Sequence, residues 1–234
     1  MARKRQEAYR QEIASEIKQT ARRQMAKYGT AGLTLRGIAR ELDITAPAIY
    51  HYFPSLDDLI TALVMDAFSE LADAMQRAGE AQVGECVGPK LKAGLMAYRA
   101  FALQNPVDFQ LIYGNPIPGY QAPFEKTAPL ARKPFIWLGR LVEEGRQSGE
   151  LKISEAYEQI PASIEQHLEG YRQMLGSQAP ASLFYCLVVA WTRGHGMVML
   201  ELFNHSPAVI GDPAAFYEHE VDRFLASLGL VGIG

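Results

Sequence analysis

The sequence has no long hydrophobic run, and this argues against a protein that spans a membrane. Its longest apolar stretch, SLFYCLVVAW, is about ten residues, whereas a helix needs roughly 20 to cross a bilayer. The N-terminus, MARKRQEAYRQEIASEIKQT, is basic and then amphipathic. It lacks the continuous apolar segment and the small-residue cleavage site of a secretory signal. We therefore expect a cytoplasmic protein.

Cysteine is scarce, and this limits metal and redox chemistry. The two cysteines, Cys86 and Cys186, lie one hundred residues apart, with no CxxC pair and no histidine-rich context. Such a pattern has no metal-ligand spacing, so we expect no metal and no cofactor. The two thiols are either unpaired in a reducing compartment or parts of a redox switch.

The motifs of catalysis and of β-structure are also missing. We find no nucleophile–base pairing, no glycine-rich phosphate loop and no carboxylate pair, so an enzyme is not expected. No stretch shows sustained strand alternation, whereas helical periodicity recurs along the chain. Hydrophobic residues at 48% and charged residues at 21% are ordinary for a globular protein. The sequence predicts an all-α fold.

Positive charge is not in excess over the whole chain, but it is concentrated at one end. The net charge is −3 for 234 residues. Residues 1–56 hold ten Lys or Arg against five Asp or Glu, hence +5, and residues 57–234 hold 13 against 21, hence −8. A basic N-terminal part on an acidic body is the asymmetry expected when only one end meets phosphate.

The N-terminal part predicts three helices and the start of a fourth. A first helix carries an apolar stripe and ends at Gly29, which we expect to be its C′ residue. Thr34 caps a second helix of about two turns. The apolar positions of these two helices are Ile13, Ile17, Ala21, Met25 and Tyr28, and then Leu35, Ile38, Ala39 and Leu42.

A third short helix follows a polar step at Asp43 and Ile44. Thr45 caps this helix, Pro47 lies in its first turn, and Pro54 follows its end at about Phe53. Ser55 and Asp58 then form a capping arrangement that opens a long fourth helix. Two short helices joined by such a step are the sequence form of a helix-turn-helix, whose second helix enters the major groove of DNA.

The residues of the third helix divide by task. Small side chains let the backbone approach base edges, and Thr45, Ala46, Pro47 and Ala48 meet that need. Ile49 and Phe53 supply the packing edge. Tyr50 and His51 project at the exposed end, where each can donate to phosphate oxygens. Tyr52 either joins Tyr50 and His51 in contacting phosphates or belongs to the core.

This stretch resembles the N-terminal DNA-binding domain of the TetR family of transcriptional regulators. The resemblance covers roughly Glu7 to Leu63 and rests on a Thr-Leu-Arg opening at Thr34, an I-A-x-x-L run from Ile38 to Leu42, and the aromatic end Tyr50 to Phe53. It implies backbone contacts at Thr34 and Arg36, and base contacts from Thr45 to Ala48. One departure is Leu56, where the family often has a phosphate-binding lysine.

The resemblance further implies a homodimer that binds a palindromic double-stranded operator, most often as a repressor released by a small-molecule effector. We expect a DNA-binding domain at residues 1–56, with its core motif at about 34–53. Residues 57–234 then form an all-helical effector-binding and dimerisation domain. The dimer would form through the last two helices, at about 180–204 and 212–229. The polar segment between about 150 and 180 has no assigned structure.

The effector site is predicted only by aromatic content. The candidates are Phe101, Phe109, Tyr113, Trp137, Trp191 and His195. Trp191, His195 and Gly196 have a W-x3-H-G spacing that is similar to one C-terminal subgroup of the family. His195 is a histidine bonded to the backbone, a polar contact in a ligand pocket, or a metal ligand.

Apart from Thr45, the leading turn of the third helix offers no hydrogen-bonding side chain. Ala46, Pro47 and Ala48 can touch only thymine methyls or sugars, so specificity should depend on Arg36, apolar contacts and DNA shape.

Two functions other than operator binding are retained as alternatives: a helix-turn-helix protein that binds a protein partner, and a helical enzyme.

Overall fold

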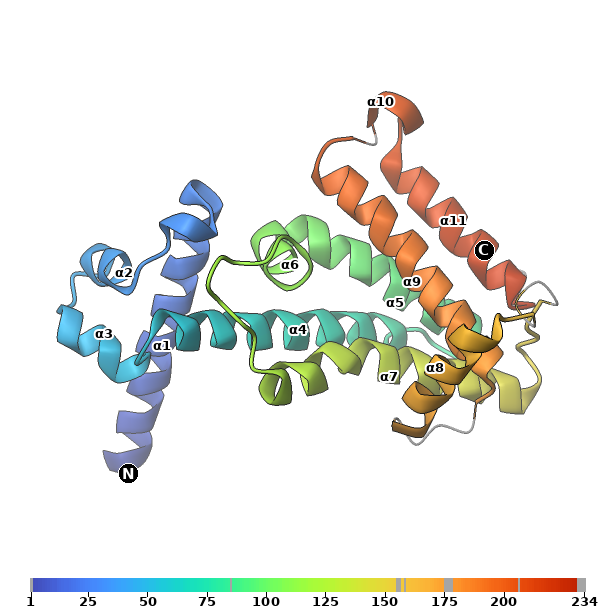
Figure 1. The fold of residues 1–234 in the computed structure, drawn as a ribbon, viewed down its shortest axis with the longest axis horizontal. Coiled ribbons are helices and arrows are strands. Elements are labelled where there is room, and N and C mark those ends of the chain that lie inside the picture. The colour runs from blue at the N-terminus through green and yellow to red at the C-terminus, as the bar shows by residue number, and fades with distance from the viewer. Residues whose placement is uncertain are drawn as a thin grey trace. The chain divides into compact units, whose positions relative to one another are not determined.

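The protein is helical throughout the part that its structure describes. The computed structural model describes residues 2–84, 86–154, 157, 159–174, 179–205 and 207–230. Every regular element within these residues is a helix (Figure 1). This confirms the all-α prediction.

Two compact units divide the chain. Unit 1 is built from residues 1–69 and 105–131, and unit 2 from residues 70–104 and 132–234. The helices α4 (Leu56–Glu80) and α7 (Phe124–Ser148) contribute residues to both. Unit 1 therefore takes in a segment that lies beyond the boundary predicted between residues 56 and 57.

Unit 1 contains the predicted N-terminal helices and one helix from later in the chain. Its core is apolar, and burying one such side chain fully is worth about 1.5 to 3 kcal/mol. Its elements besides the starts of α4 and α7 are α1 (Ala2–Tyr28), η1 (Thr30–Gly32), α2 (Leu35–Glu41), α3 (Ala46–Tyr52) and α6 (Pro106–Tyr113). Fully buried at its centre are Ile17, Ala21, Ile38, Ile49, Leu59 and Leu63.

The first helix ends as its sequence predicts, but its apolar stripe is shorter. Gly29 has φ of 71°, and its N–H donates to the Met25 carbonyl at 2.9 Å. A positive φ suits glycine, so the predicted C′ role is confirmed. The inclusion of Tyr28 in the buried stripe is wrong. Its side chain is exposed, and the ammonium of Lys27 lies 5.0 Å from its ring centroid.

A set of ion pairs joins α1 to α4 and α6 within unit 1. Arg22 Nε donates to both carboxylate oxygens of Asp108 at 2.8 and 2.9 Å, and the Asp108 side chain is only 6% exposed. Lys18 Nζ donates to Asp66 of α4 at 2.5 Å. A buried carboxylate that lost its cation would be strongly destabilising, so these pairs hold α6 against α1.

Unit 2 is built around three mutually packed helices. These are α5 (Val87–Gln104), α9 (Ala181–Leu202) and α11 (Pro213–Ser227). Tyr217 is buried among them, and its hydroxyl donates to the Leu95 carbonyl at 3.0 Å. The short α10 (Pro207–Ile210) contacts α11, and α8 (Ala162–Met174) contacts α9. The helix α8 lies in the segment that the sequence left unassigned.

Two prolines lie within α7, and two glycines of neighbouring helices lie against its Trp137 side chain. The helix begins at Phe124, ahead of Pro129 and Pro134, so neither proline delays its start. The Trp137 ring lies against Gly79 of α4 and Gly94 of α5. A Cβ built on either glycine would lie 2.4 Å from the ring. These two glycines therefore make room for the indole within unit 2.

Candidate nucleic-acid interface

The turn between α2 and α3 is fixed by backbone hydrogen bonds. Asp43 has φ of 53°, in the left-handed region that Asp and Asn tolerate better than most residues. Its N–H donates to the Arg40 carbonyl at 3.4 Å, and the Ile44 N–H donates to the Ala39 carbonyl at 3.0 Å. This pair of bonds is a Schellman motif, which ends α2 and sets the direction in which α3 leaves.

Threonine caps begin both helices of the motif. Thr34 Oγ1 accepts from the Gly37 N–H at 3.0 Å, and Thr45 Oγ1 accepts from the Ala48 N–H at 3.3 Å. Both predicted caps are therefore confirmed, and each satisfies an N–H that a helix terminus leaves open. Ser55 Oγ likewise accepts from the Asp58 N–H at 3.1 Å at the start of α4.

The first turn of α3 is small and accessible, and its opposite face is buried. Thr45 and Pro47 are exposed, and Ala46 and Ala48 are half-buried. Ile49 is fully buried in the core of unit 1. This arrangement leaves the leading turn free to approach a groove, although the base contacts of these residues stay predictions.

The aromatic end of α3 divides between surface and core. Tyr50 is 42% exposed, and His51 is exposed. Tyr52 is half-buried and packs against the core of unit 1, with its ring edge-to-face with His51 at 5.9 Å. Phe53 is buried in the core, as predicted. The side chains available to a phosphate are therefore those of Tyr50 and His51.

Two arginines lie on α2 beside this surface. Arg36 and Arg40 are both exposed and lie four residues apart, on one face of the helix. The sequence pattern predicted a DNA contact for Arg36 only, although the i, i+4 spacing also indicated Arg40 as a candidate. Leu56 packs partly against the core, so the position where a lysine was expected serves packing.

Two of the predicted effector residues are part of the core of unit 1. Phe109 is fully buried, and its ring centroid lies 5.2 Å from that of Tyr113. Tyr113 also packs edge-to-face on Phe68 at 5.9 Å. Burial raises the pKa of Tyr113 to about 12. Both residues therefore stabilise the packing of α6.

The other four predicted residues lie in unit 2, where an aromatic and polar cluster surrounds His195. The Nδ1 atom of His195 shares a hydrogen bond of 2.9 Å with the Tyr98 hydroxyl. The Trp191 ring lies 5.5 Å from His195 and 5.6 Å from Phe135. Burial lowers the pKa of His195, which favours the neutral imidazole. Phe101 is buried and Trp137 half-buried in the same unit.

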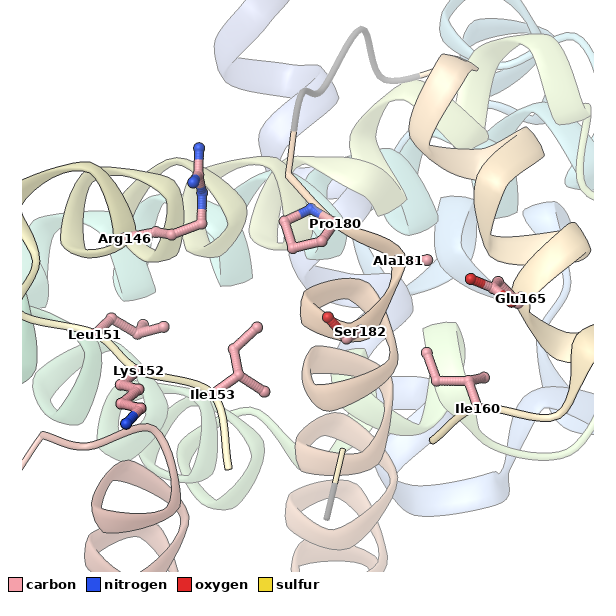
Figure 2. A pocket seen from close by; sticks show the side chains of 9 residues that line it. All are labelled: Arg146, Leu151, Lys152, Ile153, Ile160, Glu165, Pro180, Ala181 and Ser182. Carbon is pink, nitrogen blue, oxygen red and sulfur yellow. The ribbon is translucent and has the colours of Figure 1, made fainter. Parts of the chain in front are cut away.

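A cavity of about 500 Å³ opens elsewhere in unit 2. Figure 2 shows Leu151 and Ile153 on one side, Ile160 on the other, and the first turn of α9 between them. The Ser182 hydroxyl and the Glu165 carboxylate add polar groups. Arg146 also lines the cavity, but its guanidinium is paired with Glu143. Sequence periodicity gave no signal for this cavity, because its apolar walls, Leu151, Ile153 and Ile160, lie outside the helices.

The helix α9 exposes an apolar face. Val188, Leu200 and Phe203, which follows its last residue, are all exposed, and a Cβ on Gly196 would meet open space. Gly194 instead faces Tyr217 of α11. By length and composition α9 would suffice to cross a membrane, with 17% of its most apolar window buried. A single helix of this kind is weak evidence of insertion.

These features define the class of the protein. Two short helices with capped starts, a fixed turn and a small accessible tip form a helix-turn-helix, and a larger helical unit accompanies it in the same chain. The class is that of helix-turn-helix regulators of transcription. Among the described residues, no group of three His, Cys, Asp or Glu side chains could hold a metal ion.

Comparison with known proteins gives the family. The model of bacterial regulatory proteins of the tetR family matches residues 17–63, and the model of the tetracyclin repressor-like C-terminal domain matches residues 91–224. The chain belongs to the TetR family of transcriptional regulators. The likeness of the W-x3-H-G spacing to one subgroup stays a prediction.

The relatives cover nearly the whole chain. Two HTH-type transcriptional regulators, from Mycobacterium tuberculosis and Mycobacterium bovis, are each 31% identical over 94% of this chain and 93% of their own. The crystal structure of the regulatory protein SCO4313 has a TM-score of 0.77 and 30% identity, over 94% of this chain and 98% of that one. A protein of unknown function from Rhodococcus sp. RHA1 has a TM-score of 0.70 at 22% identity, over 92% and 95%; it shows the fold alone.

Proposed function

We propose that the protein is a cytoplasmic repressor that binds a palindromic operator as a homodimer and releases it when a small molecule binds unit 2. The observation that carries the DNA part is the accessible tip of α3. Thr45 and Pro47 are exposed there, while Ile49 on the opposite side is buried. Tyr50 and His51 follow on the same short helix and supply groups for phosphate contacts.

The exposed face of α9 supports the homodimer. Leu200 and Phe203 are 50% and 49% exposed, which is costly for large apolar side chains that lie next to each other. The small residue Gly196 on the same helix leaves space for a second helix to approach. On α11, Phe216 is exposed as well. A second copy that covered α9 and α11 would bury these side chains in an isologous interface.

Unit 2 also supports effector binding. The cavity of about 500 Å³ lies within the range of roughly 300 to 1,000 Å³ that is usual for small-molecule sites. It combines apolar walls, Leu151, Ile153 and Ile160, with the polar groups of Ser182 and Glu165. An effector there would need different affinities for the two conformations of the dimer in order to change DNA binding.

The coupling between effector and operator is reciprocal. A dimer bound to one face of DNA places its two recognition helices about 34 Å apart, one turn of the duplex. An effector that disfavours this spacing weakens operator binding, and operator DNA then weakens effector binding by the same factor. The continuous helices α4 and α7, which contribute to both units, are the chain segments through which such a change would pass.

The DNA part is tested by measuring the binding of the full chain to a palindromic duplex selected from random fragments. We expect Tyr50→Ala and His51→Ala each to weaken binding roughly thirtyfold, since the dimer loses two hydrogen bonds of about 1 kcal/mol each. Tyr171→Ala and His167→Ala on α8 are matched controls, because Tyr171 is 45% exposed and His167 is also exposed. Equal effects of both pairs, or salt-independent binding, would contradict the proposal.

A further inference from the structure

The first turns of α1 extend beyond the hydrophobic core of unit 1. Every side chain from Arg3 to Glu12 is exposed, and contact with the core begins at Ile13 and Ala14. Figure 1 shows these turns continuing past the end of α3. At a rise of about 1.5 Å per residue they add about 15 Å to the helix. Residues 3–12, the N-terminal arm, are therefore not needed to close the core.

The N-terminal arm carries more positive than negative charge. Arg3, Lys4, Arg5 and Arg10 stand against two carboxylates, those of Glu7 and Glu12. Within the described part of the chain, none of the four cations forms an ion pair. These charges are thus available to a partner of opposite sign.

Two of the cations lie on the side of α1 that faces the core of unit 1. Arg10 and Arg3 lie seven and fourteen residues before the buried Ile17. At about 100° per residue, these positions deviate only about 20° and 40° from the direction of Ile17. The stripe of α1 that packs in the core of unit 1 therefore continues into the arm as arginine.

We propose that the N-terminal arm binds phosphates of the duplex that flanks the operator, beyond the base pairs that α3 reads. This inference rests on the proposed function, because it requires an operator to be bound. Two observations favour DNA as the partner: the arm has the opposite charge, and its arginine stripe continues the face of α1 that packs in the core shared with α2 and α3. An arm of about 15 Å spans about four base pairs at roughly 3.4 Å each.

Phosphate contacts carry no sequence information, and this gives the proposal a distinct signature. Affinity should depend on the length of the flanking DNA and not on its sequence. Each phosphate neutralised adds about 0.9 to the slope of log affinity against log salt. With two arginines in each arm of a dimer, the flanks should add up to about 3.6 to that slope.

The experiment compares two duplexes that share the selected operator. One ends at the last base pair whose substitution changes affinity, and the other extends about ten base pairs further on each side with arbitrary sequence. We expect the full chain to bind the extended duplex more tightly and with a steeper salt slope. The double variant Arg3→Gln/Arg10→Gln should lose most of this difference, yet bind the trimmed duplex as the unchanged protein does.

The control removes the same charge elsewhere. Lys133→Gln/Arg140→Gln alters two exposed cations of α7 in unit 2 and should keep the preference for the extended duplex. Equal binding of both duplexes by the unchanged protein, or a preference that survives Arg3→Gln/Arg10→Gln, would overturn the arm's role. Binding to the trimmed duplex would show in either case that the operator function stands, whereas binding to neither duplex would overturn both proposals.

Discussion

The Thr45 hydroxyl at the tip of α3 can accept one hydrogen bond and donate another. Its oxygen accepts from the Ala48 N–H at 3.3 Å, which stabilises the start of the helix. The hydroxyl hydrogen is still available to a base or phosphate acceptor. Ala46, Pro47 and Ala48 have no polar side-chain atom to add. The structure thus sharpens the sequence argument: the first turn of α3 can offer one side-chain donor to DNA.

Arg36 should therefore determine more of the operator preference than the tip of α3 does. The family resemblance implies a backbone contact for Arg36, but this exposed arginine at the start of α2 can instead make a bidentate contact to a base, whose loss costs about 1 to 3 kcal/mol of discrimination. We expect Arg36→Ala to flatten a single-base scan of the operator by about that amount. Arg140→Ala, an exposed arginine of α7, should leave the scan unchanged. A preference that persisted in Arg36→Ala and vanished in Thr45→Val would refute this.

At the scale of helices, interactions between residues close in sequence were predictable, and those between distant residues were not. The caps at Thr34 and Thr45 each involve an N–H three residues along the chain, so the sequence was sufficient to predict them. Arg22 and Asp108 are 86 positions apart, and no local pattern around either residue predicts that the two form a pair. Periodicity therefore predicted the helix-turn-helix but not the attachment of α6 to it.

The effector site was the least predictable part, for a physical reason. Aromatic side chains fill cores and line pockets equally well, because burial of apolar area favours both. Phe109 accordingly lies in the core of unit 1, and the ring of Trp137 fills space between Gly79 and Gly94 in unit 2. The apolar lining of the cavity of Figure 2, Leu151, Ile153 and Ile160, lies outside the helices and carries no periodic signal.

Because Trp137 packs closely on α5, we expect a Gly→Ala substitution in this helix to destabilise the protein, whereas such a substitution usually stabilises a helix. Gly→Ala inside a helix normally stabilises by about 0.5 to 1 kcal/mol. A Cβ on Gly94 would lie 2.4 Å from the indole, so we expect Gly94→Ala to lower the free energy of unfolding by about 2 kcal/mol. Urea unfolding measures this, and Trp137→Leu in the same chain should reduce the loss.

A matched glycine on α8 tests that reasoning. A Cβ on Gly170 would have no neighbour within 4 Å, so Gly170→Ala should follow the ordinary rule and stabilise slightly. If Gly94→Ala also stabilised, the indole would not occupy the space between α5 and α7 that the structure shows.

At the scale of the whole molecule, the distribution of charge and the exposed face of α9 both fit the proposed homodimer on DNA. The charge of +5 on residues 1–56 attracts phosphate, and the charge of −8 on residues 57–234 repels it. Such a chain meets DNA with one end only. In the proposed homodimer each copy would read one half of the palindrome, and the contact between copies would form away from the basic end.

The interface between copies is the last prediction. Leu200→Glu and Phe203→Glu should each convert the dimer to a monomer in sedimentation equilibrium. An unpaired charge in an interface costs about 3 kcal/mol or more, hence roughly a hundredfold in dissociation constant. Both variants should also lose affinity for the palindrome while retaining helicity. Val83→Glu, at a fully exposed position outside any helix, should remain dimeric. Monomeric unchanged protein would contradict the homodimer. Dimers of Leu200→Glu that bind the palindrome normally would place the contact elsewhere, because a two-fold interface through α9 would bring two like charges together.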